Sequence, residues 1–78
     1  MNIAIIGAGL IGRKRASSLP KNVNLSVICD MDKKKVETFA HDFNCESETD
    51  WKKVVNNKNI IAVEKILPWS VKELPPLL

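Results

Sequence analysis

The sequence predicts an α/β fold, consisting of one β-α-β-α-β half of a doubly wound parallel sheet. Short apolar runs alternate along the chain with segments of helical periodicity, and the first run ends in a glycine-rich turn. Strands that alternate with helices imply parallel pairing and right-handed crossovers. With 78 residues the chain is long enough for one small domain.

The first predicted strand and helix flank the glycine-rich turn. Residues 3–6 form a continuous apolar run that ends at Gly7, which is typical of a strand buried on both faces. Residues 10–19 predict a helix that ends at Pro20. The apolar residues of this helix expected to face the sheet are Leu10, Ile11, Ala16 and Leu19.

A second strand and helix follow. Residues 23–30 are rich in β-branched and apolar residues and predict the second strand. Asp32 is the expected N-cap of the next helix, and Asn44 can adopt the left-handed conformation that ends it. The apolar residues of this helix lie at positions i, i+3, i+4 and i+7, and they are Val36, Phe39, Ala40 and Phe43.

The rest of the chain predicts only two more elements. A third helix is expected after Asp50 over residues 51–55, and a third strand over residues 60–63. We therefore expect residues 1–63 to form one partial domain and residues 64–78 to form a divergent tail. The second half of the sheet is not expected in this chain. The first strand would then be an exposed apolar edge, and such an edge favours self-association.

The turn over residues 7–12 has the form G-x-G-x-x-G between a predicted strand and a predicted helix. Gly7 lets the chain turn sharply, Gly9 lets a pyrophosphate approach the backbone, and Gly12 lets the helix pack closely on the strand. The N–H groups at the helix start then face the phosphates, and the helix dipole favours their negative charge. The turn therefore predicts a partial Rossmann fold that binds a dinucleotide.

Asp30 supports this prediction, because it ends the second strand 18 residues after Gly12. A carboxylate at this position can accept hydrogen bonds from the adenosine ribose hydroxyls. The same carboxylate would repel the 2′-phosphate of NADP, so NAD is the favoured cofactor. Three nearby bases, Lys33, Lys34 and Lys35, leave NADP open. The alternative is that the glycines form only a tight turn and that Asp30 is only a neighbour of a helix cap.

The remaining polar and aromatic residues give weaker indications of function. Arg13 in the first turn of the helix is the base best placed to contact a phosphate or an adenine. Lys14 and Arg15 are expected to belong to a solvated basic face. His41 is expected at the surface and Trp51 in the core.

Composition excludes several classes of function. The net charge is +3, and the positive residues form short clusters separated by an acidic stretch, so no nucleic-acid partner is expected. Cys29 and Cys45 match neither a disulfide framework nor a metal-ligand spacing. We therefore expect no metal site and a reducing, cytoplasmic location. No apolar run approaches the roughly 20 residues that a membrane span needs, so no membrane partner is expected.

Several motifs together resemble the N-terminal cofactor domain of the Gfo/Idh/MocA oxidoreductases. They are IIGAGLIGR at residues 5–13, VICD at residues 27–30, FAHDFNC at residues 39–45 and the helix around Trp51. The resemblance implies an NAD(P)-dependent oxidoreductase that acts on sugars, inositols or related polyols. Carried over by position, it implies that Gly7, Gly9 and Gly12 hold the pyrophosphate and Asp30 the ribose. It also implies that Ala8, Leu10, Ile11 and Arg13 line the adenosine side.

The chain departs from the family after the third predicted strand. The family has a further helix and strand there, followed by a Glu-Lys-Pro motif whose lysine helps to position the substrate and nicotinamide. Here the segment reads Glu64-Lys65-Ile66. It is either a remnant of that motif or a chance match in a frameshifted end, and we favour chance. Lys65 is the sole candidate for a catalytic residue, and the family's substrate domain is expected to be absent.

The leading hypothesis is a truncated oxidoreductase that binds NAD(P) and has little or no activity of its own. One alternative is a subunit of a split dehydrogenase whose substrate domain lies on another chain. Another is a non-catalytic cofactor-sensing or interaction module that forms a homo-oligomer through its unfinished sheet edge. FAD is a further candidate ligand, since the same type of turn binds it.

Overall fold

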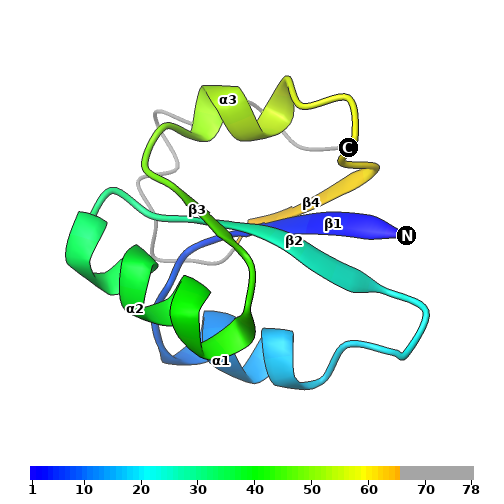
Figure 1. Ribbon diagram of the computed structural model, residues 1–78, viewed down its shortest axis with the longest axis horizontal. Coiled ribbons are helices and arrows are strands. Elements are labelled where there is room, and N and C mark those ends of the chain that lie inside the picture. The colour runs from blue at the N-terminus through cyan, green and yellow to red at the C-terminus, as the bar shows by residue number, and fades with distance from the viewer. Residues whose placement is uncertain (66–78) are drawn as a thin grey trace.

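The structure is a computed structural model that describes residues 1–65. Four strands and three helices alternate along this part of the chain (Figure 1). The strands are β1 (Asn2–Ile6), β2 (Asn24–Cys29), β3 (Glu46–Glu48) and β4 (Ala62–Lys65), and the helices are α1 (Leu10–Ser17), α2 (Lys33–Phe43) and α3 (Trp51–Val55). The predicted tail lies outside the described residues from Ile66 onward.

The strands form one parallel sheet in the order β3-β2-β1-β4. The helices α1 and α2 cover one face of the sheet and α3 covers the other (Figure 1). The result is a three-layer arrangement in which the carboxyl ends of all four strands lie along the same edge. The prediction of a partial Rossmann fold is confirmed.

The prediction that the first strand is an exposed edge is wrong. β1 pairs with β2 on one side, and on the other side it pairs with β4 from Ile3 opposite Ala62 to Ile6 opposite Lys65. The third predicted strand is this β4, which begins two residues later than expected and returns to the outer side of β1. Its pairing satisfies the backbone groups that were expected to be open.

β3 was not predicted from the sequence. Its three residues are Glu-Ser-Glu, which carry no apolar run or alternation that would indicate a strand. β3 pairs with β2 from Val27 opposite Glu46 to Cys29 opposite Glu48. Charged side chains on a short edge strand discourage pairing with another molecule.

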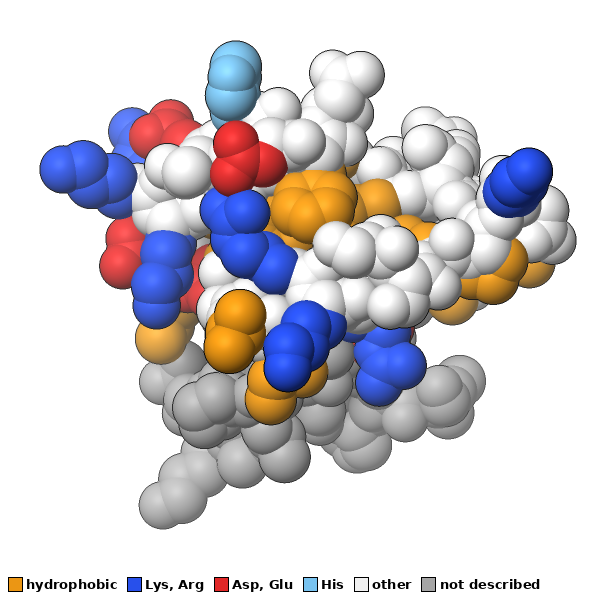
Figure 2. All heavy atoms as spheres, turned by 90° about the horizontal axis from the view of Figure 1, so that it is seen from below, with side chains coloured by type: hydrophobic (Ala, Val, Ile, Leu, Met, Phe, Trp, Pro, Cys, Tyr) orange, Lys and Arg blue, Asp and Glu red, His pale blue; other side chains and the backbone are white. Residues whose placement is uncertain are grey.

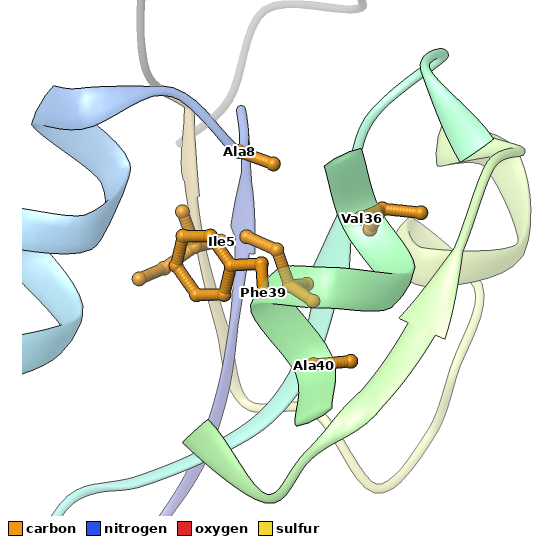
Figure 3. Close-up of a cluster of buried hydrophobic side chains, with 6 residues drawn as sticks. Ile5, Ala8, Val36, Phe39 and Ala40 are labelled. Atoms are coloured by element: carbon orange, nitrogen blue, oxygen red, sulfur yellow. The ribbon is translucent and has the colours of Figure 1, made fainter. Parts of the chain in front are cut away.

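The core has two clusters because both faces of the sheet are covered. On the α3 face Ala4 and Ile6 pack with Val27, Cys29 and Val54. On the other face the buried residues are Ile5, Ala8, Ile28, Val36, Phe39 and Ala40. Figure 3 shows the second cluster, in which Phe39 projects from α2 toward Ile5 of the central strand. Successive side chains of β1 therefore point to opposite faces, as strand geometry requires.

The predicted ends of α2 are confirmed. The Asp32 carboxylate accepts a hydrogen bond from the Lys35 N–H at 3.1 Å, as an N-cap should. Asn44 has φ of 53° and ends the helix in the left-handed conformation. The expected apolar face is also present, because Val36, Phe39 and Ala40 are buried.

The first turn of α1 differs from the prediction. Leu10 and Ile11 were expected to face the sheet but are 70% and 56% exposed. Gly12 is instead the buried residue of α1, and Ala16 packs against the second core cluster, which contains Ile5 and Phe39. The helix approaches the sheet at its glycine, so the two large residues before it point outward. His41 is exposed, as predicted, whereas Trp51, which was expected in the core, is only partly buried and packs against the cluster of Ala4, Ile6 and Val54.

Candidate nucleotide-binding site

The glycine turn and Asp30 meet at the carboxyl edge of the sheet, because β1 and β2 are parallel neighbours. In open α/β sheets, ligands bind at this edge. Gly7 follows β1 with φ of 121°, a conformation that favours glycine. Its N–H donates to the Cys29 carbonyl at 2.7 Å, which continues the pairing of the two strands into the turn.

The missing side chain has a different consequence at Gly12 and at Gly9. A Cβ built at Gly12 would collide with the Gly7 carbonyl oxygen and would lie 3.2 Å from its carbon. Gly12 therefore permits the close contact of helix and strand. A Cβ built at Gly9 meets no atom within 4 Å, and Gly9 has an extended backbone with φ of −85°. Nothing in the fold of the described residues requires a glycine there, so its missing side chain leaves space on the ligand side.

The amino end of α1 faces this space. Gly9 is the N-cap of the helix, and no side chain caps it within the described residues. The helix start therefore presents N–H groups together with the positive end of the helix dipole, which is the arrangement that binds phosphate groups. The space in front of Gly9 and the N–H groups behind it both fit a pyrophosphate.

Asp30 lies against the turn. Its Oδ2 accepts the Ala8 N–H at 2.8 Å, and its Oδ1 accepts the Asp32 N–H at 3.0 Å. The side chain is half-buried rather than covered. The structure thus brings together the two parts of the motif that the sequence predicted, although Ala8 and Asp30 are 22 residues apart.

A cleft of about 620 Å³ opens between α1 and α2. On one side it is lined by Ala8, Gly9, Leu10 and Arg13, and on the other by Asp32, Lys34, Lys35 and Thr38. We call it the α1–α2 cleft. Figure 2 shows the molecule from the side of these two helices, where Lys and Arg side chains are prominent. Thr38 was not predicted from the sequence as a site residue. It lies one helical turn beyond Lys34 on α2, and this spacing could have indicated that the two side chains share a face.

Arg13 is held by α2. Its Nη2 donates to Asp42 Oδ2 at 2.9 Å, and its guanidinium lies 5.1 Å from the ring centroid of Phe39 and 5.9 Å from that of Phe43. The residue expected to contact a phosphate or adenine therefore lines the α1–α2 cleft while its charge is paired with Asp42. Sequence reasoning missed Asp42, since the two residues lie on different helices.

The other predicted residues take separate places. Leu10 lines the α1–α2 cleft, whereas Ile11 is exposed outside its lining. Arg15 is exposed, as expected for a solvated face, and it forms an ion pair with Glu64 of β4 at 2.8 Å. Lys65 is the last residue of β4 and lies opposite Ile6. Its backbone is therefore at the same edge of the sheet as the glycine turn.

The two cysteines are free thiols. Burial raises the pKa of Cys29 to about 12, and the nearby carboxylates of Glu48 and Asp30 add to the effect. Burial also raises the pKa of Cys45. Both thiols are therefore protonated near neutral pH and are poor nucleophiles.

Residues 1–65 lack two kinds of feature. No group of three or more His, Cys, Asp or Glu side chains in this part of the chain could hold a metal ion. None of its helices combines the length and the apolar character needed to span a bilayer.

The chain is similar to solved oxidoreductases. An NAD-binding oxidoreductase from Klebsiella pneumoniae is 28% identical, with a TM-score of 0.73 over 87% of this chain and 21% of that one. A myo-inositol 2-dehydrogenase from Lactobacillus plantarum is 26% identical, with a TM-score of 0.76 over 87% of this chain and 21% of that one. A myo-inositol dehydrogenase from Lactobacillus casei, solved with NAD(H) and myo-inositol, is 22% identical, with a TM-score of 0.75 over 85% and 21%.

The chain thus spans about a fifth of the length of these solved proteins. No curated protein matches it. The family model described as "Oxidoreductase family, NAD-binding Rossmann fold" matches residues 1–67, which include the glycine turn, Asp30 and all four strands. The chain therefore belongs to the Gfo/Idh/MocA oxidoreductase family and corresponds to part of its NAD-binding Rossmann domain.

Proposed function

We propose that this chain binds NAD(H) as the partial cofactor domain of a sugar or polyol dehydrogenase. The observation that carries the proposal is the open space in front of Gly9, at the uncapped start of α1 and next to Asp30. The fold and the family of the chain support the same role.

Each part of the site has a separate task in this proposal. Gly7 and Gly12 shape the turn, Gly9 makes room, and the N–H groups at the start of α1 donate to the pyrophosphate. Asp30 accepts hydrogen bonds from the ribose hydroxyls. Ala8, Leu10, Ile11 and Arg13 are the proposed contacts on the adenosine side. Bound NAD would supply a hydride acceptor, and the described residues hold and orient it.

We further propose that NAD is preferred over NADP. The Asp30 carboxylate at the end of β2 disfavours a 2′-phosphate beside the ribose. Lys34 and Lys35 line the α1–α2 cleft and lessen that repulsion, so NADP is expected to bind with lower affinity rather than to be excluded.

Catalysis and assembly are also part of the proposal. Solved neighbours include enzymes complexed with myo-inositol and with levoglucosan, which makes a sugar or polyol the proposed substrate class. Because the chain spans about a fifth of those proteins, we propose that it is inactive alone, with Lys65 the sole catalytic candidate. The alternatives are a subunit of a split dehydrogenase and a cofactor-sensing homo-oligomer. The homo-oligomer would associate through the sheet edge formed by β4.

Calorimetric titration of the full chain with NAD, NADP and FAD tests the proposal. We expect saturable binding of NAD and weaker binding of NADP, whereas binding of FAD in preference to NAD would favour the flavin alternative. A change of oligomeric state on NAD binding would favour the sensing module, and turnover of NAD with a polyol would overturn the proposed inactivity. Absence of NAD binding at millimolar concentration would overturn the proposed function.

A further inference from the structure

The Asp30 carboxylate accepts hydrogen bonds from the protein's own backbone. Its Oδ2 accepts the N–H of Ala8, which is only 4% exposed. Ala8 lies in the middle of the glycine turn, at the upper end of the buried cluster in Figure 3. An N–H at a residue this little exposed is costly to leave without an acceptor. The conformation of the turn therefore depends on a side chain that follows another strand.

The second carboxylate oxygen extends this connection to α2. Asp30 Oδ1 accepts the Asp32 N–H at 3.0 Å, and Asp32 in turn caps α2 through the Lys35 N–H at 3.1 Å. One carboxylate thus joins the glycine turn to the segment that leads into α2. These two segments carry the two sides of the α1–α2 cleft.

Two successive backbone N–H groups of the turn donate hydrogen bonds to the residues at the end of β2. Gly7 donates to the Cys29 carbonyl at 2.7 Å, and Ala8 donates to the Asp30 carboxylate at 2.8 Å. The first bond is made by the backbone and does not depend on residue type. The second depends on the Asp30 side chain, so a substitution there removes it selectively.

We propose that Asp30 is a positioning residue that holds the pyrophosphate-binding turn in its binding conformation, apart from its contact with ribose. The inference rests on the proposed dinucleotide site. A carboxylate offers about four lone-pair positions, and the two backbone donors leave the others free for ribose hydroxyls. Both roles can therefore operate together, and they predict different losses when the side chain is removed.

The first test uses the chain without ligand. Amide hydrogen exchange of Ala8, followed by NMR, is compared in the parent, Asp30→Ala and Asp32→Asn. We expect Asp30→Ala to accelerate exchange of the Ala8 amide about tenfold or more. Asp32→Asn removes the same charge two residues away, and asparagine is also a good N-cap, so it should leave Ala8 protected. Unchanged Ala8 protection in Asp30→Ala would overturn the inference, whether or not the chain binds NAD.

The second test separates the turn from the ribose. Affinities for ADP and for 2′,3′-dideoxy-ADP, which lacks both ribose hydroxyls, are measured for the same three proteins. A positioning role predicts that Asp30→Ala binds both ligands about tenfold more weakly than Asp32→Asn does. A ribose contact alone would leave the dideoxy ligand unaffected. That result would overturn the positioning role and leave the proposed nucleotide site intact.

Asp30→Asn serves if Asp30→Ala does not fold. Asparagine keeps one acceptor oxygen and presents an NH2 group in place of the other. At least one of the Ala8 and Asp32 amides should therefore lose protection by about tenfold. Full protection of both amides in a folded Asp30→Asn variant would contradict the proposal.

Discussion

The three glycines of the turn differ in what surrounds them, and their substitutions should therefore differ in effect. Gly9→Val places a side chain where the protein has no atom within 4 Å, so circular dichroism should stay nearly unchanged while NAD binding is abolished. Gly12→Val is the matched control, since its side chain would collide with the Gly7 carbonyl and should unfold the chain. NAD binding by Gly9→Val equal to that of the parent would show that the turn is merely structural.

Asp30 should also set the cofactor preference. A hydrogen bond to a charged group contributes about 1.5–3 kcal/mol, so Asp30→Ala should weaken NAD binding by about 10- to 100-fold. NADP should lose less, because the same change removes the repulsion between the carboxylate and the 2′-phosphate. Calorimetry with both cofactors measures this difference, and equal losses would argue against the assigned role.

Cys29 should make stability depend on pH in the alkaline range. Its pKa rises from 9.0 to about 12 in the folded protein because the thiol is buried. The stabilisation is complete below pH 9 and is lost as the pH rises toward 12, since the unfolded thiol ionises first. Urea unfolding at increasing pH should show a loss of up to about 1.4 kcal/mol per pH unit. Cys29→Ala should show a shallower decline, and identical slopes would contradict the prediction.

At the scale of elements, Arg13 connects α1 to α2 through Asp42, Phe39 and Phe43. An exposed ion pair contributes about 0–1 kcal/mol and an exposed cation–π contact about 0.5–1 kcal/mol. Arg13→Met should therefore lower the free energy of unfolding by about 1 kcal/mol in urea denaturation. Lys14→Met removes the same charge from the next, exposed position of α1. Equal destabilisation by both changes would mean that the contacts with α2 contribute nothing.

Because β1 is paired on both sides, self-association of the chain through a sheet edge is expected at a different strand. β1 is central, whereas β4 is the outermost strand next to it and, among residues 1–65, pairs with β1 alone. On the other side, β3 is short and carries two glutamates, which disfavour edge pairing. An intermolecular contact through the sheet edge is therefore expected to involve β4.

For the whole molecule, we predict self-association or a loosely folded state of the isolated chain. A chain of 78 residues has a small core, and exposed strand edges promote aggregation at micromolar concentration and above. Analytical ultracentrifugation combined with hydrogen exchange measures both properties. A monomer with well-protected amides at about tens of micromolar, where exposed strand edges are expected to aggregate, would show that the partial domain folds alone.

The sequence by itself determined the features that depend on neighbouring residues. The cap at Asp32, the left-handed Asn44 and the special conformation of Gly7 were predictable because each follows from residue type within one turn of chain. The glycine motif and Asp30 could also be predicted, since the spacing in a β-α-β unit brings their positions to one edge of the sheet.

Only the tertiary structure decided what depends on pairing between distant segments. It placed β4 against β1, gave the polar β3 its hydrogen bonds to β2, and turned Leu10 and Ile11 outward. It also joined residues 22 and 29 positions apart, as Ala8 to Asp30 and Arg13 to Asp42. Such contacts form only once the sheet has set the relative positions of its helices and loops, so no local pattern in the sequence encodes them.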